Sequence, residues 1–245
     1  MLYDFFWRVF NSFVTYIEFN LMMKEATMQL FIGNKNYSTW SLRAWYLMSK
    51  FNVIFNENQL VLDTPDFYSE LQKHFKVQKV PALIDGDLAV WDSLAICEYI
   101  NDAYLLGEAW PANIKLRAKA RSLSAEMHSG FMALRNEMPM NIRATRNVTL
   151  SDAAKIEIAR IDDIFTAQQT LFPNSWLFDE FSIVDAMYTP IVLRLKTYQI
   201  NLSPQAQQYC EHVFNCPVLQ RWITQALTET DIVDSDEAGI DVLTP

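Results

Sequence analysis

Residues 29–43 read QLFIGNKNYSTWSLR, and the pattern of this stretch changes twice along its length. A short apolar run predicts a β-strand, and a polar turn without proline follows it. Apolar groups at helical spacing over residues 42–48 then predict a helix that closes near Phe51. The first backbone N–H groups of a helix lack internal partners and carry the positive end of the helix dipole. The turn around Ser38 is therefore suited to holding an anion.

Length and composition indicate one or two globular domains with a sizeable core, because 51% of the 245 residues are hydrophobic and 20% are charged. The net charge of -9 argues against a general nucleic-acid-binding surface. The three cysteines form no C-x-x-C pair, which indicates neither a disulfide framework nor a zinc site. We expect no bound metal and a reducing, cytoplasmic compartment.

Residues 1–28 are rich in Phe, Tyr and Met, but Asp4, Arg8 and Glu18 interrupt the apolar run. A signal peptide is excluded because no positive n-region and no small-residue cleavage site are present. A transmembrane helix is excluded because no uncharged stretch of ~20 residues exists. One interpretation is a non-essential leader before an effective start at a later methionine (22, 23 or 28). The other is an amphipathic helix that uses Phe6, Phe10, Phe13 and Ile17.

Residues 29–106 alternate strand and helix patterns and predict a small α/β unit. A second strand is expected over residues 54–62 and a loosely helical segment over 67–75. Two apolar runs flank Asp85-Gly86, which predicts an antiparallel hairpin. Pro81 stands where the third strand begins, and its plain interpretation is a trans proline at a sheet edge. Asp92 or Ser93 is a candidate N-cap for the next helix.

Residues 107–113 read as a linker, and residues 114–227 carry only long helical periods. One helix is expected over 114–142, and two more over 204–214 and 217–227. Capping-box spacing occurs at 149–152 and at 182–185, where it predicts helix starts. The tail, residues 228–245, is acidic and expected to be mobile. The predicted architecture is an α/β domain followed by an all-helical domain.

The predicted βαβαββα order, with a proline before the third strand, resembles a thioredoxin-like domain. Together with the helical domain it resembles the cytosolic glutathione S-transferase superfamily over residues 28–227. Three motifs carry the resemblance, at residues 37–43, 79–83 and 92–96. The first motif is similar to that of serine-type members, including zeta-like and bacterial transferases. Two features depart from the family: the segment 1–28, and Asp92 where glutamate is more common.

The first motif has the spacing at which thiol-redox relatives hold Cys-x-x-Cys, but it reads Ser38-Thr39-Trp40-Ser41. Dithiol exchange is therefore impossible at this turn. A hydroxyl can instead donate a charge-assisted hydrogen bond to a bound thiolate. The resemblance implies that Ser38 stabilises the thiolate of glutathione, the co-substrate, with Thr39 or Ser41 as alternatives. Tyr37 lies next to Ser38 and could stabilise the thiolate instead, as in tyrosine-type members of the superfamily.

The resemblance also assigns the rest of the tripeptide. It puts Asp92 against the ammonium of the γ-glutamyl group and Ser93 against its carboxylate, at a helix start. Val80, the residue before Pro81, would pair its backbone with the cysteinyl moiety. Capping alone remains the alternative for Asp92 and Ser93. Two candidates to bind the glycyl carboxylate are Lys79 and His74. The alternative for Lys79 is an ordinary solvent-exposed side chain.

The second substrate is expected between the domains. Helical spacing puts His128, Met132 and Arg135 on one face of the predicted long helix, where they could line that cleft. The alternatives are that Met132 belongs to the core and that Arg135 pairs with Glu137 or a distant acid.

The resemblance implies a glutathione S-transferase that conjugates hydrophobic electrophiles, with a role in detoxification, and a homodimer. A first alternative is a zeta-like cis-trans isomerase. Such an enzyme needs cationic side chains to bind a substrate with two carboxylates. The candidate cations are Arg43, Arg117, Arg135 and Arg143. A second alternative is a non-catalytic interaction protein with this fold. Neither nucleic acid nor membrane is expected as a partner.

Overall fold

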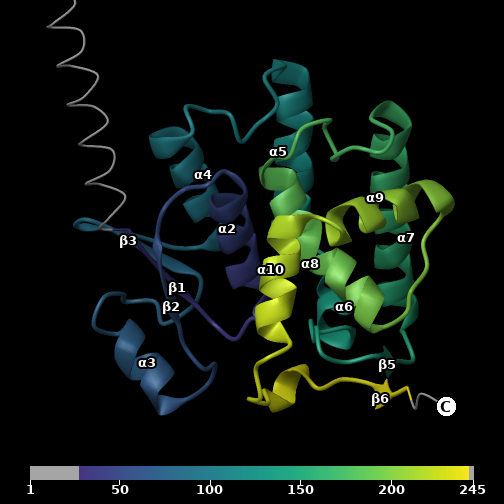
Figure 1. Cartoon of the computed structure of the whole chain (residues 1–245). Coiled ribbons are helices and arrows are strands. Elements are labelled where there is room, and N and C mark those ends of the chain that lie inside the picture. The colour runs from purple at the N-terminus through teal and green to yellow at the C-terminus, as the bar shows by residue number, and fades with distance from the viewer. Residues whose placement is uncertain (1–27, 243–245) are drawn as a thin grey trace, which may run out of the picture.

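The computed structural model describes residues 28–242, which form a domain with a four-stranded sheet and a domain of helices (Figure 1). The predictions for a leader lie outside the described residues except at Met28. The elements of the first domain are β1 (Gln29–Ile32), α2 (Thr39–Lys50), β2 (Asn56–Gln59), α3 (Pro65–Leu71), β3 (Ala82–Asp85), β4 (Leu88–Val90) and α4 (Ser93–Tyr104). This order confirms the predicted βαβαββα unit.

The sheet has the strand order β2-β1-β3-β4. β2 runs parallel to β1, whereas β3 is antiparallel to both β1 and β4. Gly86 takes φ +61° in the turn between β3 and β4, a conformation that glycine adopts without steric cost. The predicted hairpin is therefore confirmed. The second strand is shorter than the predicted range 54–62, and α3 ends at Leu71 rather than at residue 75.

The two faces of the sheet bury different partners, because successive side chains of a strand point to opposite faces. Leu30 and Ile32 of β1 lie in the large core that includes residues of α2, α4 and the helical domain. Phe31 packs instead with Phe67 and Leu71 of α3. α2 and α4 thus share one face of the sheet, and α3 covers the other (Figure 1).

Pro81 differs from its plain interpretation. The Val80–Pro81 peptide bond is cis, and the strand that follows it is not at an edge, because β3 lies between β1 and β4. Pro81 itself precedes the strand, so its missing N–H removes no hydrogen bond from the ladder.

The second domain is built from six helices in the described part of the chain, and α8 is buried along nearly its whole length. No helix within residues 28–242 has both the length and the apolar character needed to cross a bilayer. The six helices are α5 (Ile114–Ser129), α6 (Met132–Glu137), α7 (Asp152–Leu171), α8 (Ile183–Thr197), α9 (Pro204–Phe214) and α10 (Pro217–Ala226).

The single long helix predicted over residues 114–142 is wrong. α5 ends at Ser129, Phe131 takes φ +60°, and α6 starts at Met132. A Cβ at Gly130 would lie 2.9 Å from the carbonyl oxygen of Glu126, so the chain can turn there only without a side chain. Apolar periodicity continues across the break because both helices pack on the same core, which hid the break from the sequence pattern.

The two predicted capping boxes have different outcomes. The box predicted at residues 149–152 is wrong in register, because its first residue is not the N-cap of α7. The N-cap is Ser151, whose hydroxyl accepts from Ala154 N at 3.2 Å. The Glu137 carboxylate accepts from the Ser151 N–H and hydroxyl, at 2.8 and 2.6 Å, and orients that cap. The second is confirmed at Ser182 and Asp185, where α8 begins.

Asp185 is fully buried and accepts hydrogen bonds from Leu177 N, Ser182 N and the Tyr209 hydroxyl, at 2.9, 2.9 and 3.0 Å. Burial raises the pKa of its carboxyl from 3.8 to about 6, although these hydrogen bonds act in the opposite direction. A pKa raised in the folded state stabilises the fold at low pH and loses that contribution as pH rises.

We therefore expect the stability of the wild type relative to Asp185→Asn to be greatest below about pH 4 and to fall as pH rises through about 6. Asparagine does not titrate, so the difference between the two proteins isolates this one group. Urea unfolding at several pH values measures it. A difference that grows with pH would show that the carboxylate is the form preferred by the fold.

The tail was expected to be mobile, and this expectation is wrong for its described part. The segment folds back so that β6 (Ile240–Asp241) pairs antiparallel with β5 (Arg146–Asn147). A short 3-10 helix, Asp234–Asp236, precedes β6. Acidic side chains of this segment contact the loop between β1 and α2 and basic residues of the helical domain. Spacing along the sequence could not reveal these long-range partners.

Candidate functional site

Three predicted motifs meet at one end of the sheet. β1 and β3 are antiparallel, with Phe31 opposite Ala82, so the end of β1 lies beside the start of β3. β4 is antiparallel to β3, with Val90 opposite Leu83, so its exit lies at the same end. The start of α2, the loop before β3 and the start of α4 are consequently neighbours. Topology alone brings Ser38, Val80 and Asp92 to one place.

The hydroxyls at the start of α2 form a short hydrogen-bonded chain. Ser38 is the N-cap residue, but its side chain caps no backbone N–H of the helix. Its Oγ lies 2.7 Å from Ser41 Oγ, and Ser41 Oγ accepts from Gly33 N at 3.1 Å. Ser41 is fully buried, whereas Ser38 and Thr39 each keep 6% of their surface exposed. Ser41 therefore supports Ser38, and a ligand would meet Ser38 or Thr39.

Tyr37 is committed to other contacts. It is buried, and its hydroxyl donates to Glu237 Oε1 at 2.5 Å and accepts from Arg143 Nη2 at 2.9 Å. Burial and the hydrogen bond to Glu237 raise the pKa of the Tyr37 hydroxyl above its ordinary value. A buried phenol with two partners is poorly placed to activate a ligand, which argues against a tyrosine mechanism here.

Both oxygens of Asp92 have partners at the start of α4. Oδ1 accepts from Leu94 N and Ala95 N at 3.1 and 3.2 Å, so Asp92 is the N-cap. Oδ2 lies 2.8 Å from Nε2 of His128 on α5. Half of the Asp92 side chain remains exposed, so it can still receive a ligand cation.

Ser93 is the first residue of α4 and is fully buried. Its hydroxyl oxygen has no hydrogen-bond partner among the described residues. A buried polar atom without a partner is uncommon in a folded protein. A hydroxyl in this position, at the start of a helix, could donate to a ligand oxygen.

His128 joins the start of α4 to the start of α2. Its ring meets the Trp40 ring edge-on, with centroids 5.5 Å apart. Two guanidinium groups contact Trp40 in turn, with Arg43 at 4.3 Å and Arg135 at 4.6 Å from its ring centroid. Trp40 was not predicted as a site residue, although its spacing of three from Arg43 is that of a helix-surface pair. The domain boundary at this point is thus aromatic and cationic.

Arg43 and Arg135 differ in how their charges are satisfied. Arg135 Nε donates to Gly130 O at 2.9 Å, and its Nη2 donates to Met127 O, so it caps the end of α5. Arg43 is 1% exposed, and its Nε and Nη1 have no hydrogen-bond partner in the described part of the chain. Burial, with Arg135 and Arg194 nearby, lowers the pKa of Arg43 well below its ordinary value.

The predicted shared face of His128, Met132 and Arg135 is wrong, because the first lies on α5 and the other two on α6. Met132 is 56% exposed and therefore is not a core residue. Arg135 binds the backbone carbonyls described above rather than Glu137. His128 and Arg135 nevertheless meet at Trp40, so they lie close to the start of α2 by a route that helical spacing did not predict.

The remaining predicted residues lie before β3. Val80 is half-buried and Lys79 is exposed. His74 is exposed, lies 3.8 Å from the Glu70 carboxylate, and packs against Phe31 on the α3 face of the sheet. Nothing in these contacts brings His74 to Ser38, so its role and that of Lys79 stay predictions.

The three cysteines are buried and form no disulfide. Burial raises the pKa of Cys97 above its ordinary value and that of Cys210 to about 12. These thiols are therefore protonated near neutral pH. No group of three or more His, Cys, Asp or Glu residues within 28–242 is arranged to hold a metal ion.

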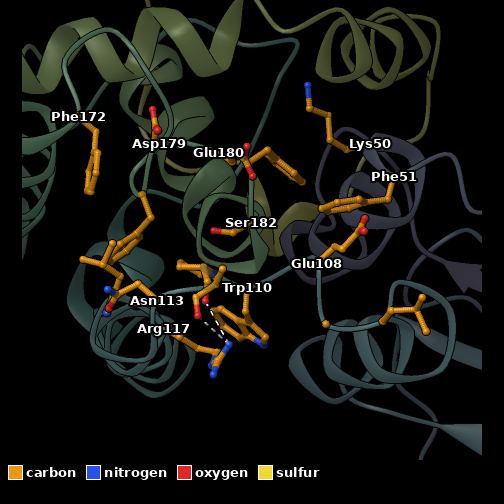
Figure 2. A pocket seen from close by; sticks show the side chains of 17 residues that line it. Lys50, Phe51, Glu108, Trp110, Asn113, Arg117, Phe172, Asp179, Glu180 and Ser182 are labelled. Atoms are coloured by element: carbon orange, nitrogen blue, oxygen red, sulfur yellow. Dashed lines mark hydrogen bonds between the residues drawn. The ribbon is translucent and has the colours of Figure 1, made fainter.

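A large cavity lies away from this end of the sheet. It measures about 820 Å³ and opens between the end of α2, the linker and the loop before α8 (Figure 2). Lys50 and Phe51 line it at the C-terminal end of α2, the end opposite Ser38. Figure 2 shows Arg117 hydrogen-bonded beneath Trp110, and its partners are the carbonyls of Pro111 and Ala112.

Residues 26–102 match the family model of the glutathione S-transferase N-terminal domain. The N-terminal domain belongs to the glutathione S-transferase family. The fold is shared over both domains: a glutathione transferase homologue from Burkholderia, solved with bound glutathione, superposes with a TM-score of 0.62 at 22% identity. That superposition covers 81% of this chain and 97% of the other. The predicted resemblance and the two-domain fold class are thereby confirmed.

The curated proteins to which this chain is similar carry different names. A stringent starvation protein A homolog of Histophilus somni is 23% identical over 158 residues, which are 63% of this chain and 72% of that protein. The maleylacetoacetate isomerase of Mus musculus is 27% identical over 139 residues, which are 56% of this chain and 63% of the isomerase. The matched region is thus less than two thirds of the length of the isomerase.

Proposed function

We propose that this chain binds glutathione at the end of the sheet where Ser38, Val80 and Asp92 meet, and conjugates it through its sulfur to a hydrophobic electrophile. The observation that carries the proposal is the Ser93 hydroxyl, which is buried without a partner beside the exposed carboxylate of Asp92. An ammonium and a carboxylate on one carbon, as in the γ-glutamyl group, match this pair of groups. A fold shared with a glutathione-bound homologue supports the same site.

The thiol would lie at the start of α2. A free thiol has a pKa of about 8.5, so little of it is ionised at neutral pH. A hydroxyl donor and a helix N-terminus together can lower that pKa by about one to two units, since each unit corresponds to ~1.4 kcal/mol. In the structure Ser38 donates to Ser41 Oγ, which also accepts from Gly33 N. On binding, the Ser38 hydroxyl would rotate from Ser41 to donate its proton to the thiolate sulfur.

The remaining parts of glutathione follow from the neighbouring segments. The Val80 backbone would pair with the cysteinyl moiety in the manner of an added strand. Lys79 or His74 would meet the glycyl carboxylate. The electrophile would lie against Trp40 and His128, at the boundary between the domains. The sulfur attacks the electrophilic carbon and displaces its leaving group or adds to its double bond. We also propose that the protein is a cytoplasmic homodimer with a detoxifying role.

A second candidate function is a glutathione-dependent cis-trans isomerase for a dianionic substrate. Arg43 favours it, because its buried Nε and Nη1 have no hydrogen-bond partner among the described residues and could donate to an anion. Arg135 contacts the same Trp40 ring as Arg43. The similarity to a maleylacetoacetate isomerase points in the same direction. In contrast, Arg117 and Arg143 are engaged by backbone carbonyls. Turnover of maleylacetone without net loss of glutathione would favour this candidate over the transferase.

The proposal is tested by titrating the protein with glutathione in a calorimeter and then assaying a panel of aromatic halides and enals. We expect saturable binding and loss of thiol with at least one electrophile. Absence of glutathione binding at millimolar concentration would refute the proposal and favour a non-catalytic interaction protein.

Replacing Asp92 with asparagine should separate its two roles. Asparagine caps helices about as well as aspartate, so we expect the free energy of unfolding to change by less than about 0.5 kcal/mol. The charge that faces the ligand ammonium is lost, so the glutathione dissociation constant should rise about tenfold. Urea unfolding and calorimetry measure the two quantities. A large loss of stability with unchanged affinity would reduce Asp92 to a structural cap.

A further inference from the structure

The described tail runs from the end of α10 along the bottom of the molecule to β5, as the yellow segment of Figure 1 shows. On the way it touches the loop of residues 33–38, which connects β1 to α2 and ends at Ser38. The segment Thr228–Val242, here called the C-terminal strap, therefore joins the last part of the chain to the proposed glutathione site.

The central contact of the strap is the Glu229 carboxylate. Its Oε1 accepts from Lys35 N at 2.7 Å, and its Oε2 accepts from Asn36 N at 2.9 Å. The Gln59 side-chain amide of β2 also donates to Oε1. Two successive backbone N–H groups that converge on one carboxylate form an anion-binding concavity. Hydrogen bonds to an ionised acceptor of this kind are about twice as strong as neutral ones.

Other strap residues hold the rest of the loop. Glu237 accepts from the Tyr37 hydroxyl at 2.5 Å and from Asn141 Nδ2 at 2.9 Å. Arg143 donates to the backbone carbonyl of Glu229, to that of Asp231 at 2.6 Å, and to the Tyr37 hydroxyl at 2.9 Å. The strap thus bridges the loop and the helical domain.

The loop also has attachments that do not involve the strap. The Lys35 carbonyl accepts from Trp222 Nε1 at 2.9 Å, and Lys35 Nζ contacts Glu57 and Gln225. These contacts hold the carbonyl and the side chain of Lys35, whereas its N–H and that of Asn36 point to Glu229. Removal of Glu229 should therefore leave the loop tethered, with the orientation of its peptide groups released.

Loop orientation is transmitted directly to Ser38. Ser38 N donates to the Asn34 carbonyl at 2.8 Å, and Tyr37 N donates to the same oxygen at 3.2 Å. The turn that these bonds close delivers Ser38 as the N-cap of α2. A loop that populates several arrangements would present the hydroxyl correctly for only part of the time, and apparent affinity falls by that fraction.

We propose that Glu229 is a positioning residue for the glutathione site: its carboxylate fixes the Lys35 and Asn36 peptide groups and thereby holds Ser38 in the arrangement that receives the thiolate. The inference rests on the proposed function for its effect on glutathione. Its effect on the loop itself does not depend on that function.

The experiment compares the full-length wild type with Glu229→Gln and Glu229→Ala. Asp234→Asn is the matched control. Asp234 is an exposed acid of the same strap, and its side chain makes no hydrogen bond or ion pair with the described residues. Backbone amide exchange of Lys35 and Asn36 is followed by NMR. Glutathione affinity and the pKa of bound glutathione are measured by calorimetry and by ultraviolet absorbance of the thiolate. Thermal unfolding verifies that each variant is folded.

We expect the Lys35 and Asn36 amides to exchange at least about 100-fold faster in Glu229→Ala. The glutathione dissociation constant should rise at least about fivefold, and the pKa of the bound thiol should move toward that of free glutathione. Glu229→Gln should be intermediate, since its amide retains one acceptor, and Asp234→Asn should match the wild type.

Unchanged exchange at both amides in the Glu229 variants would overturn the inference, whatever happens to glutathione. Faster exchange with unchanged affinity and thiol pKa would overturn the positioning role. If the wild type itself fails to bind glutathione, the proposed function fails and the positioning role with it, while the exchange data still decide whether Glu229 orders the loop. A Glu229→Ala protein that does not fold leaves Glu229→Gln to decide each point.

Discussion

Replacing Ser38 with alanine should lower the turnover number for glutathione conjugation about tenfold or more at neutral pH, with a much smaller effect on glutathione binding. The reason is that Ser38 would stabilise the thiolate, whereas the γ-glutamyl and cysteinyl contacts would lie elsewhere in the site. The helix N-terminus remains in the variant, so we expect the loss of about one unit of pKa depression, which corresponds to ~1.4 kcal/mol and to a factor of about ten. Steady-state kinetics with varied glutathione, together with calorimetry, separates the two quantities.

Two neighbouring variants serve as controls for this change. Thr39→Val removes the other hydroxyl that keeps some exposed surface and should leave turnover within about twofold of the wild type if Ser38 makes the contact. Ser41→Ala removes the partner of Ser38 and leaves Gly33 N–H without its acceptor, so we expect an intermediate loss. Equal losses of turnover and binding in Ser38→Ala would mean that Ser38 only positions the ligand. A larger loss in Thr39→Val would move the role to Thr39.

Replacing Asp185 with alanine should lower the free energy of unfolding by about 3 to 5 kcal/mol. The side chain is fully buried, and its removal leaves Leu177 N, Ser182 N and the Tyr209 hydroxyl without their acceptor. Each buried donor left unpaired costs about 1 to 3 kcal/mol. Burial by itself raises the pKa of the Tyr209 hydroxyl, so in the variant this group stays protonated and remains a buried donor without an acceptor.

Asp152→Ala is the matched control for that loss. Asp152 is also an acid in the first turn of a helix, but its side chain is 95% exposed and pairs with Lys155 on the surface. Its replacement should change stability by less than about 0.5 kcal/mol. Urea unfolding of the two variants supplies both values. Similar small losses in both would show that the helix start at Ser182 does not depend on the buried carboxylate.

The features that the sequence predicted correctly depend on neighbours along the chain. The strand, turn and helix around Ser38, the Asp85-Gly86 hairpin and the capping box at Ser182 are set by local spacing and turn chemistry, which a single sequence displays. The predicted N-cap at Asp92 also follows from local preference, and the structure confirms it.

The features that were missed depend on distant partners or on single backbone angles. The break at Phe131 is one residue with positive φ inside an uninterrupted apolar period. The pairing of Asp92 with His128 and the contact of Trp40 with Arg135 require the packed domains. The acidic tail from residue 228 was expected to be mobile as a chain terminus. Its order comes instead from N–H groups and cations about two hundred positions earlier or in the helical domain.

The central claim is that glutathione binds with its sulfur ionised beside Ser38, and titration of the bound thiol tests it most directly. The ultraviolet absorbance of the thiolate is followed against pH for glutathione bound to the wild type and to Ser38→Ala. We predict a bound pKa about one to two units below the value of about 8.5 for a free thiol in the wild type, returning toward that value in the variant. A bound pKa equal to that of the free thiol, or one lowered equally in both proteins, would contradict the account.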